Sequence, residues 1–513
     1  MGASSDIGYL GFGRERGGGF QRITRSLCRG ERRERVLAPC HLEENVHGSG
    51  SISTSLLALA LSVASPAAAD PTSRLAEAVT FRTVSPQTPA DFDPEPFLAF
   101  RGFLEQSFPQ VHRALEREIV SKYSLLYTWR GSESSLPPVL LTAHFDVVPV
   151  VPGSLDRWSQ PPFAGVVADG YVWGRGTLDD KVGVMGMLEA LESLVASGFA
   201  PRRTVYLALG HDEELGGDEG ARAIVDLLEA RGVRLWFSLD EGMAIVEGMA
   251  GLSEPVAMIG VAEKGFLTLE LTASAPGGHS SMPPKSSAIG RLAKAVQRVE
   301  EDPLPAHLGG MVGSMLDSIA PMLPAGQRFA IGQRWLLGPF LARALAADPA
   351  TNAMIRTTTA VTMVRGGVKS NVLPSTATAT VNFRVHPGDT VDEIVAHVRE
   401  AIDDPEIAIA VVAASEASDV ASSSSDAYEM LRATLGELYP GMPVAPALVV
   451  GGTDSKHYMR IADDAYRFSP IRIGPDDRSR IHGIDERIGV DVYAEVAPFY
   501  QALLTRVAGP AAD

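Results

Sequence analysis

The stretch TVYLALGHDEELGG, Thr204–Gly217, decides the fold class of this chain. Its first half is an apolar run of strand length, which is typical of a strand buried inside a sheet. Its second half places two adjacent carboxylates, Glu213 and Glu214, directly after that strand. Because ligands gather at the carboxyl ends of the strands in parallel α/β sheets, this loop is a candidate part of a functional site.

The same succession of strand, loop and helix recurs on both sides of this stretch. VLLTA (139–143) precedes His144, and RLWFSL (234–239) precedes Asp240. Starting at Val184, apolar residues recur at i, i+4, i+7 and i+11, which predicts a helix with one buried face. Repeats of this kind predict an α/β fold with a mostly parallel sheet and helices on both faces.

The pattern changes near residue 261. FLTLELTA (266–273) and TATATVNFRV (376–385) alternate apolar and polar residues, as strands with one buried face do. The order strand, helix, two strands, helix, strand describes a half-open, ferredoxin-like α+β sheet with two helices on one face. We therefore predict an inserted lid or dimerisation domain at 261–416, and a catalytic domain formed by 71–260 and 417–513.

Between the first helix and the second strand of this insertion lies an extra segment, Asp302–Pro349, which is rich in Pro, Leu, Met and Gly. It includes the large apolar residues Phe329, Trp335, Leu336 and Phe340. Two interpretations stay open. The segment either lines a pocket for an acyl chain or is a packing elaboration of the domain or dimer surface.

Composition restricts the partners of the protein. The 513 residues are 45% hydrophobic and 21% charged, which allows a sizeable core and more than one domain. The net charge of −17 argues against a nucleic-acid or anionic-membrane partner. The only cysteines are Cys28 and Cys40, so any zinc in the later part of the chain must be held by histidines and carboxylates.

The first seventy residues have a different composition. Residues 1–50 are rich in Gly, Arg and Ser without periodicity, which predicts a disordered leader. SISTSLLALALSVASPAAAD (51–70) resembles the apolar region and cleavage site of a secretory signal and is too short to span a bilayer. We therefore expect a secreted or periplasmic protein. If 51–70 is instead part of a disordered tail, the protein is cytoplasmic.

Five segments contain histidine or carboxylate side chains, which are the types that bind catalytic metals. They are HFD (144–146), GTLDDK (176–181), HDEELGG (211–217), SLDEG (238–242) and RIHG (480–483). Together they supply histidines and carboxylates that suit a pair of hydrolytic metal ions, which need a bridging carboxylate, terminal ligands and room for water.

Asp179 is the candidate bridge, because it lies in a glycine-rich loop just ahead of a helix. His144 and Asp240 would complete one metal site, and Glu214 and His482 the other. These ligands tolerate zinc, cobalt or manganese. Four further histidines are assigned to structural or surface positions: His211, His307, His397 and His457.

Two more carboxylates are assigned supporting roles. Glu213 adjoins a ligand without being one, so it is placed to take a proton from the attacking water and pass it to the leaving nitrogen. Asp146 can accept the N–H of His144 and fix its tautomer. Alone, each motif has a simpler explanation, and Asp179-Asp180 is also expected at a helix N-terminus, where the helix dipole favours carboxylates. Their conjunction, each motif after a strand, favours the metal site.

Residues 71–510 resemble the family of dizinc exopeptidases and deacylases that includes glutamate carboxypeptidase, aminoacylase-1 and yeast carboxypeptidase S. The strings that carry the resemblance are HFDVVP, WGRGTLDDK, HDEELGG, GGHSSMPP, GGVKSNVLP, VNFRVHPGDT and RIHGIDERI. They occur in nearly this form in the carboxypeptidase S branch, which also holds a secreted enzyme acting on N-fatty-acyl amino acids. The resemblance implies two zinc ions per subunit, a homodimer and the ligand roles given above. Relatives differ over one ligand, so Glu241 could replace Asp240.

The resemblance also implies substrate-binding residues. In relatives, the residues equivalent to His279 and Asn371 help to bind substrate, and the histidine reaches the partner subunit's site and supports the oxyanion. Arg384 would pair with the substrate carboxylate, and Thr453, in the GGTD loop, would line the same pocket. Without the resemblance, Arg384 is interpreted as an exposed strand arginine and His279 as a turn histidine.

We predict a two-metal amidohydrolase that cleaves an amide bond beside a free carboxylate, foremost a carboxypeptidase acting on short peptides of the Gly-X type. An N-acyl-amino-acid hydrolase using the same site is the alternative. A non-catalytic metal- or ligand-binding protein is disfavoured by Glu213, because a scaffold has no need of a base beside a ligand. A two-metal phosphate-ester hydrolase ranks last, since the sequence lacks the extra Arg/Lys clamp that phosphoryl chemistry favours.

Overall fold

The computed structural model describes residues 70–249, 252 and 254–510. The predicted leader, all of the predicted signal except Asp70, and both cysteines lie outside the described residues. Within the described part of the chain, no helix combines the length and the apolar character needed to cross a bilayer.

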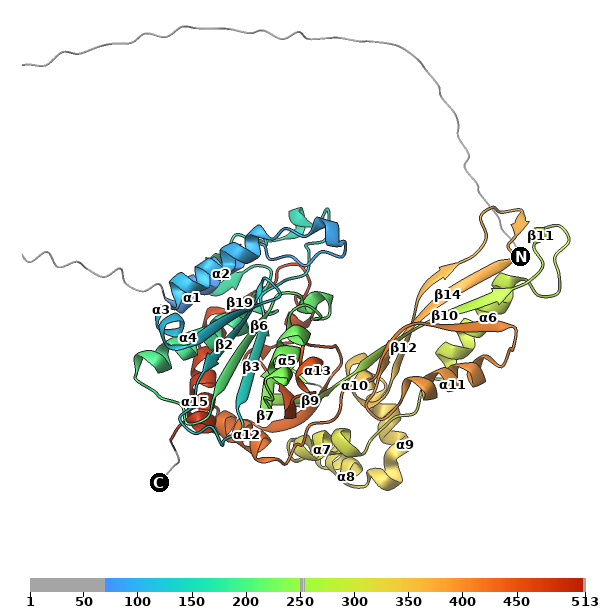
Figure 1. Ribbon diagram of the computed structural model, residues 1–513. Coiled ribbons are helices and arrows are strands. Elements are labelled where there is room, and N and C mark those ends of the chain that lie inside the picture. The colour runs from blue at the N-terminus through green and yellow to red at the C-terminus, as the bar shows by residue number, and fades with distance from the viewer. Residues whose placement is uncertain (1–69, 250–251, 253, 511–513) are drawn as a thin grey trace, which may run out of the picture. The chain divides into compact units, whose positions relative to one another are not determined.

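A ten-stranded mixed sheet forms the larger part of the described chain (Figure 1). From one edge to the other its strands are β1 (Glu116–Val120), β2 (Ser124–Trp129), β6 (Val205–Gly210), β3 (Val139–His144), β7 (Leu235–Asp240), β17 (Ala462–Arg467), β9 (Val256–Glu263), β8 (Ile245–Val246) and β18 (Arg472–Ile473), and β16 (Val444–Val449) pairs with β9. The central strands β6, β3, β7 and β17 are parallel, whereas antiparallel pairs occur toward both edges.

Helices cover both faces of this sheet (Figure 1). The neighbours Leu140 and Leu141 of β3 are both buried but belong to two different cores, because successive side chains of a strand point to opposite faces. Leu141 shares its core with α1 (Pro71–Thr80), α2 (Glu95–Ser107), α4 (Lys181–Ala196), α12 (Asp426–Leu438) and α15 (Val496–Ala508), and Leu140 with α5 (Ala221–Ala230) and α13 (Ser455–Tyr458). The predicted α/β architecture is confirmed.

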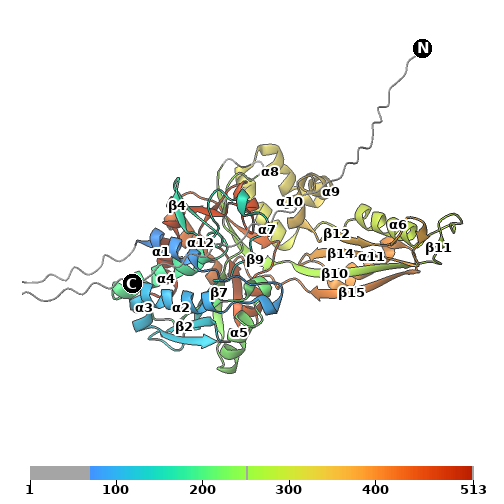
Figure 2. The same cartoon turned by 90° about the horizontal axis from the view of Figure 1, so that it is seen from above.

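A second, antiparallel sheet has the strand order β12-β14-β10-β15, seen side by side in Figure 2. Its strands are β10 (Gly265–Ser274), β12 (Thr358–Arg365), β14 (Thr376–Val385) and β15 (Ile407–Ser415), and its helices are α6 (Ala288–Glu301) and α11 (Val391–Ile402). Alternate residues of β10 and β14 are buried against these helices, as the sequence pattern predicts. The chain order strand, helix, two strands, helix, strand is present.

The extra segment forms four helices, α7 (Gly310–Ile319), α8 (Ala325–Gly332), α9 (Arg334–Leu345) and α10 (Pro349–Ile355). Val312 and Leu316 of α7 share a core with Met258 of β9 and Ala445 of β16. The segment therefore packs on the large sheet, although its position in the chain places it inside the predicted insertion at 261–416.

Candidate active site

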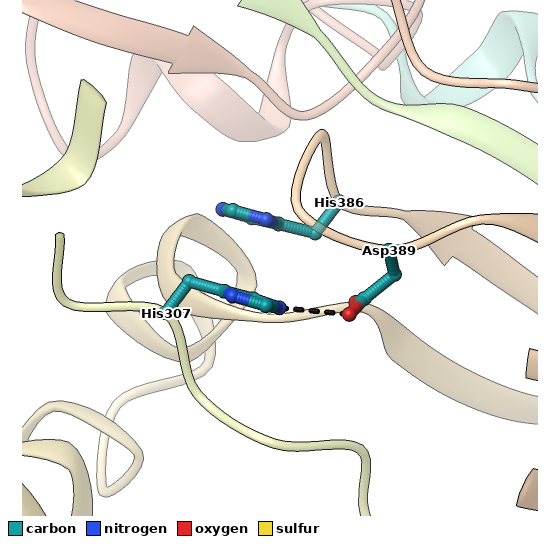
Figure 3. A group of neighbouring side chains, drawn as sticks. All are labelled: His307, His386 and Asp389. Atoms are coloured by element: carbon teal, nitrogen blue, oxygen red, sulfur yellow. Dashed lines mark hydrogen bonds and ion pairs between the residues drawn. The ribbon is translucent and has the colours of Figure 1, made fainter. Parts of the chain in front are cut away.

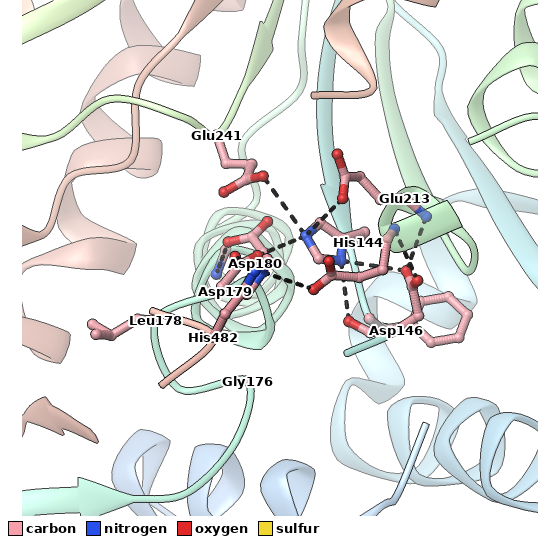
Figure 4. Close-up of polar contacts among 12 residues, drawn as sticks. His144, Asp146, Gly176, Leu178, Asp179, Asp180, Glu213, Glu241 and His482 are labelled. Atoms are coloured by element: carbon pink, nitrogen blue, oxygen red, sulfur yellow. Dashed lines mark hydrogen bonds and ion pairs between the residues drawn. The ribbon is translucent and has the colours of Figure 1, made fainter. Parts of the chain in front are cut away.

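Acidic and histidine side chains meet at the carboxyl ends of the central parallel strands (Figure 4). They come from five places in the chain: His144 ends β3, Asp179 precedes α4, Glu213 and Glu214 follow β6, Glu241 follows β7, and His482 lies in the loop before β19 (Arg487–Gly489). Parallel strands deliver these residues to one edge of the sheet, although they lie far apart in the sequence.

Asp179 lies between the two histidines. Its Oδ1 is 2.9 Å from Nε2 of His144, and its Oδ2 is 2.9 Å from Nε2 of His482. The same His482 nitrogen is 3.2 Å from Oε1 of Glu214. Each oxygen of Asp179 thus faces a different imidazole, which is the arrangement that a carboxylate bridging two cations requires.

The structure brings Glu241, and not Asp240, toward His144. Oε1 of Glu241 is 3.7 Å from Nε2 of His144, and both residues offer ligand atoms to one group together with Glu213. Asp240 is buried, and its Oδ1 accepts the backbone N–H of Glu241 at 2.9 Å. The preferred ligand Asp240 therefore does not match the geometry, because adjacent residues at a strand end point to opposite sides.

Asp146 ties His144 to the turn that carries the two glutamates. Its carboxylate lies 3.3 Å from Nδ1 of His144 and accepts the backbone N–H groups of Glu213 and Glu214, both at 3.2 Å. It also accepts the hydroxyl of Ser85 at 2.7 Å. Although burial opposes ionisation, the hydrogen bond from His144 lowers the pKa of Asp146. Asp146 thereby orients the imidazole and fixes the glutamate backbone.

Glu213 lies beside this cluster, with Oε2 4.0 Å from Nε2 of His144 and only 13% of its side chain exposed. Burial raises the pKa of Glu213 well above its usual range, and the carboxylates of Asp454 and Glu241 add to this effect while His144 opposes it. A carboxylate with an increased proton affinity beside the reaction centre suits general acid–base chemistry.

The donor set fits divalent metal ions. Four carboxylates converge on two imidazoles, and oxygen and imidazole nitrogen are the donors that hold catalytic zinc. Asp179 and Glu214 together raise the pKa of His482 to about 10.

A buried ion pair that the sequence interpretation missed holds two of the ligand loops together. Arg175 and Glu486 are 2.5 Å apart, and Oε1 of Glu486 accepts the backbone N–H of Leu178 at 2.9 Å. Nη2 of Arg175 donates to the backbone oxygen of His482 at 3.0 Å. The loop of Asp179 is thereby fixed to the loop of His482. The only sequence signal was the occurrence of both charges inside the motif strings WGRGTLDDK and RIHGIDERI.

Residues 140–506 match the family described as Peptidase family M20/M25/M40. The chain belongs to the M20 peptidase family. It is 41% identical over 438 residues to the probable carboxypeptidase S-like 2 of Dictyostelium discoideum, with 84% of each chain covered. It is 43% identical over 410 residues to the N-fatty-acyl-amino acid synthase/hydrolase PM20D1 of Xenopus tropicalis, covering 79% of this chain and 80% of that protein.

Among solved structures, the M20 family metallo-carboxypeptidase Sso-CP2 from Sulfolobus solfataricus shares the fold, with a TM-score of 0.59 and 18% identity over 85% of this chain and 98% of that one. The M20 membership and the named relatives establish this protein as an enzyme, a metal-dependent hydrolase of amide bonds.

Of the predicted substrate residues of this M20 enzyme, His279 and Asn371 lie near each other at the exposed ladder of β11 (Gly278–His279) and β13 (Val372–Leu373). Nδ1 of His279 is 2.7 Å from the hydroxyl of Ser281. In the described part of the chain, neither residue has a hydrogen bond or ion pair with the cluster.

Arg384 is exposed on β14, opposite Phe266 of β10 and Thr358 of β12. Among the described residues its side chain has no hydrogen bond or ion pair. Thr453 is buried, and its N–H and hydroxyl both donate to Glu263, at 3.0 and 2.7 Å. Thr453 therefore anchors its loop and does not present its side chain to a ligand, contrary to its predicted place in the pocket.

A second group with metal-binding side chains lies outside the cluster and consists of His307, His386 and Asp389 (Figure 3). The two imidazole rings are stacked, with centroids 4.6 Å apart and planes 6° from parallel. Nε2 of His307 is 2.8 Å from Asp389, and Nδ1 of His386 accepts the N–H of Gly388 at 2.9 Å. Nε2 of His386 is buried without a hydrogen-bond partner among the described residues, and the structural role predicted for His307 stays a prediction.

Proposed function

We propose that this M20 enzyme hydrolyses the amide bond of N-acyl amino acids that carry a long apolar acyl chain. The observation that carries the proposal is the row His144–Asp179–His482, with the largely buried Glu213 beside it. We further propose two zinc ions per subunit, one held by His144 and Glu241, the other by Glu214 and His482.

Two divalent cations bound in this way would polarise the scissile carbonyl and activate water. Glu213 accepts the proton of the attacking water and returns it to the leaving nitrogen, which a carboxylate with a raised pKa does efficiently. Asp146 keeps the backbone of Glu213 in place during both transfers. Asp179, fixed through Glu486, keeps the two histidines at a constant separation.

Arg384 supports recognition of the free carboxylate of the substrate. It is an exposed guanidinium whose side chain has no partner among the described residues. A guanidinium binds carboxylates in a bidentate manner.

We also propose a homodimer in which His279 and Asn371 of one subunit complete the site of the other, where the imidazole donates to the developing oxyanion. This accounts for two exposed polar residues that have no contact with the cluster of their own subunit. The sequence of 51–70 supports export of the enzyme.

Apolar residues next to the ligands favour a substrate with an apolar acyl group. Leu215 follows Glu214 and is 48% exposed, and Ile481 precedes His482 and is 37% exposed. The relative from Xenopus tropicalis is named for its action on N-fatty-acyl amino acids. Short peptides are the second candidate, because the relative from Dictyostelium discoideum is named as a carboxypeptidase S-like protein.

The test is hydrolysis by the full chain, loaded with zinc, of a long-chain N-acyl amino acid, an N-acetyl amino acid and a Gly-X dipeptide. Release of free amino acid is measured with and without a chelator. We expect chelator-sensitive release that is fastest from the long-chain substrate. A preference for the dipeptide would refute the acyl specificity, and no release from any substrate by folded, metal-loaded protein would refute the proposed activity.

A further inference from the structure

Two consecutive helices of the extra segment, α8 and α9, expose large apolar side chains. The exposed fractions are 64% for Phe329, 79% for Trp335, 61% for Leu336 and 75% for Phe340. More than half of each of these side chains is exposed, so none of them is enclosed in a pocket. A group of exposed aromatic residues of this kind marks a surface that contacts an apolar partner.

Trp335, Leu336 and Phe340 belong to α9, whereas Phe329 belongs to α8. Leu341 and Leu345 of α9 pack against the core that α7 forms with the large sheet, whereas no residue of α9 is fully buried. Leu336 and Phe340 lie one turn apart, and therefore on the same side of α9. The apolar residues thus project from a fixed support.

The sequence between Asp317 and Asp348 is basic, whereas the chain as a whole is acidic. Between Asp317 and Asp348 there are three arginines and no acidic residue, while the chain carries a net charge of −17. Arg334 pairs with Asp317 at 2.6 Å, and Arg343, seven residues after Leu336, lies on the exposed side of α9. The net charge of −17 does not prevent this segment from binding an anionic surface, because charges more than about 8 Å away are largely screened at physiological ionic strength.

We infer that the face formed by Phe329, Trp335, Leu336 and Phe340 docks on a lipid surface that carries anionic headgroups. Aromatic and leucine side chains of a surface helix enter the boundary between headgroups and acyl chains, and arginines at its border attract anionic lipids.

Docking would bring the enzyme to its substrate. N-acyl amino acids with long chains are anionic amphiphiles and therefore reside in lipid assemblies. This consequence rests on the proposed function, whereas the docking itself rests only on the exposed face and its charge.

The experiment measures co-sedimentation of the full chain with vesicles of phosphatidylcholine alone and of phosphatidylcholine mixed with phosphatidylglycerol. We expect binding to the mixed vesicles and a loss of affinity on the order of 100-fold in Trp335→Ser/Phe340→Ser, about tenfold for each aromatic residue. The matched control is Ile119→Ser/Val167→Ser, which removes two apolar residues that are 50% and 51% exposed on β1 and β4 (Val166–Ala168). It should bind as the parent chain does.

A charge variant separates the two contributions. Arg328→Gln/Arg343→Gln should lose the preference for phosphatidylglycerol. Equal binding by Trp335→Ser/Phe340→Ser and the parent chain, or no binding by the parent chain, would overturn the inference. A change from dimer to monomer in Trp335→Ser/Phe340→Ser, measured by light scattering, would assign the face to a second copy instead.

Hydrolysis of a water-soluble N-acetyl amino acid is measured for every variant. Because this substrate does not depend on vesicles, the assay reports catalysis separately from docking. Hydrolysis without vesicle binding refutes the docking alone. Vesicle binding without hydrolysis of any amide supports the docking and refutes the proposed function.

Discussion

Replacing Asp146 with asparagine tests whether this carboxylate orients His144 and the turn that carries Glu213 and Glu214. The carboxylate accepts hydrogen bonds from Ser85 and from the backbone of Glu213 and Glu214, and it faces the ring nitrogen of His144. Asparagine keeps one oxygen and replaces the other with an NH₂ group, which cannot accept from an N–H donor. At least one charge-assisted hydrogen bond is lost, and each contributes about 1.5–3 kcal/mol.

A loss of this size corresponds to a decrease in kcat/KM of about 10- to 100-fold, because 1.4 kcal/mol is a factor of ten. Zinc affinity should decrease by up to about tenfold, since Nδ1 of His144 loses the charged carboxylate and keeps only the backbone oxygen of residue 146, at 3.1 Å. The assays are amide hydrolysis under saturating zinc and a zinc titration of the metal-free protein. Ser85→Ala, which removes one neutral donor, should lower the free energy of unfolding by about 1 kcal/mol.

Asp212→Asn is the matched control, because Asp212 is a largely buried carboxylate in the same turn that accepts the N–H of Glu219 at 2.7 Å. We expect it to alter thermal stability but to keep the zinc affinity of the parent chain. Asp146→Asn with unchanged activity and zinc affinity would refute the orienting role. An equal loss of zinc affinity in Asp212→Asn would attribute the effect to general loosening of the turn.

Three further outcomes follow from the cluster. Glu213→Gln should bind the same amount of zinc, measured by elemental analysis, but lose turnover by about 10³-fold, because the proton acceptor is absent; activity near that of the parent chain would contradict its role. Glu241→Ala should lose about half of the bound zinc whereas Asp240→Asn keeps it, and the reverse result would restore Asp240 as the ligand. Removing the metal should lower the melting temperature, by an amount equivalent to about 3–4 kcal/mol when free metal had been at 100 to 1,000 times its Kd, since the metal binds the folded chain and not the unfolded one. An unchanged melting temperature would show that the folded chain had bound no metal.

Much of the fold could be predicted from residue periodicity. The apolar run around Leu140 and Leu141 requires two buried faces, and the alternation in β10 requires one, so both sheets follow from local sequence. The sequence does not determine where the extra segment packs. Its apolar residues satisfy any core equally well, and only the three-dimensional arrangement shows that Val312 and Leu316 reach the large sheet.

The convergence of His144, His482 and Asp179 could be predicted, because a metal site needs these side chain types and the motifs place them at the ends of strands or in nearby loops. The choice between Asp240 and Glu241 was not, since it depends on the direction in which the backbone leaves β7. The burial of Thr453 could not be predicted from the sequence either, because its partner Glu263 lies 190 residues away in the chain.

The positions of the ligands depend on charged residues that are not ligands themselves. Asp146 connects β3 to the turn after β6, and the pair Arg175–Glu486 connects the loop before α4 to the loop of His482. Each of these buried charges is stable only because a second loop supplies its partners, and neither loop can move without leaving a charge unpaired. The loops of a hydrolytic site, which are usually the mobile part of an α/β fold, are here held to one another as well as to the sheet. Catalytic geometry in this enzyme is therefore expected to be as sensitive to Glu486 as to the residues that contact the metal.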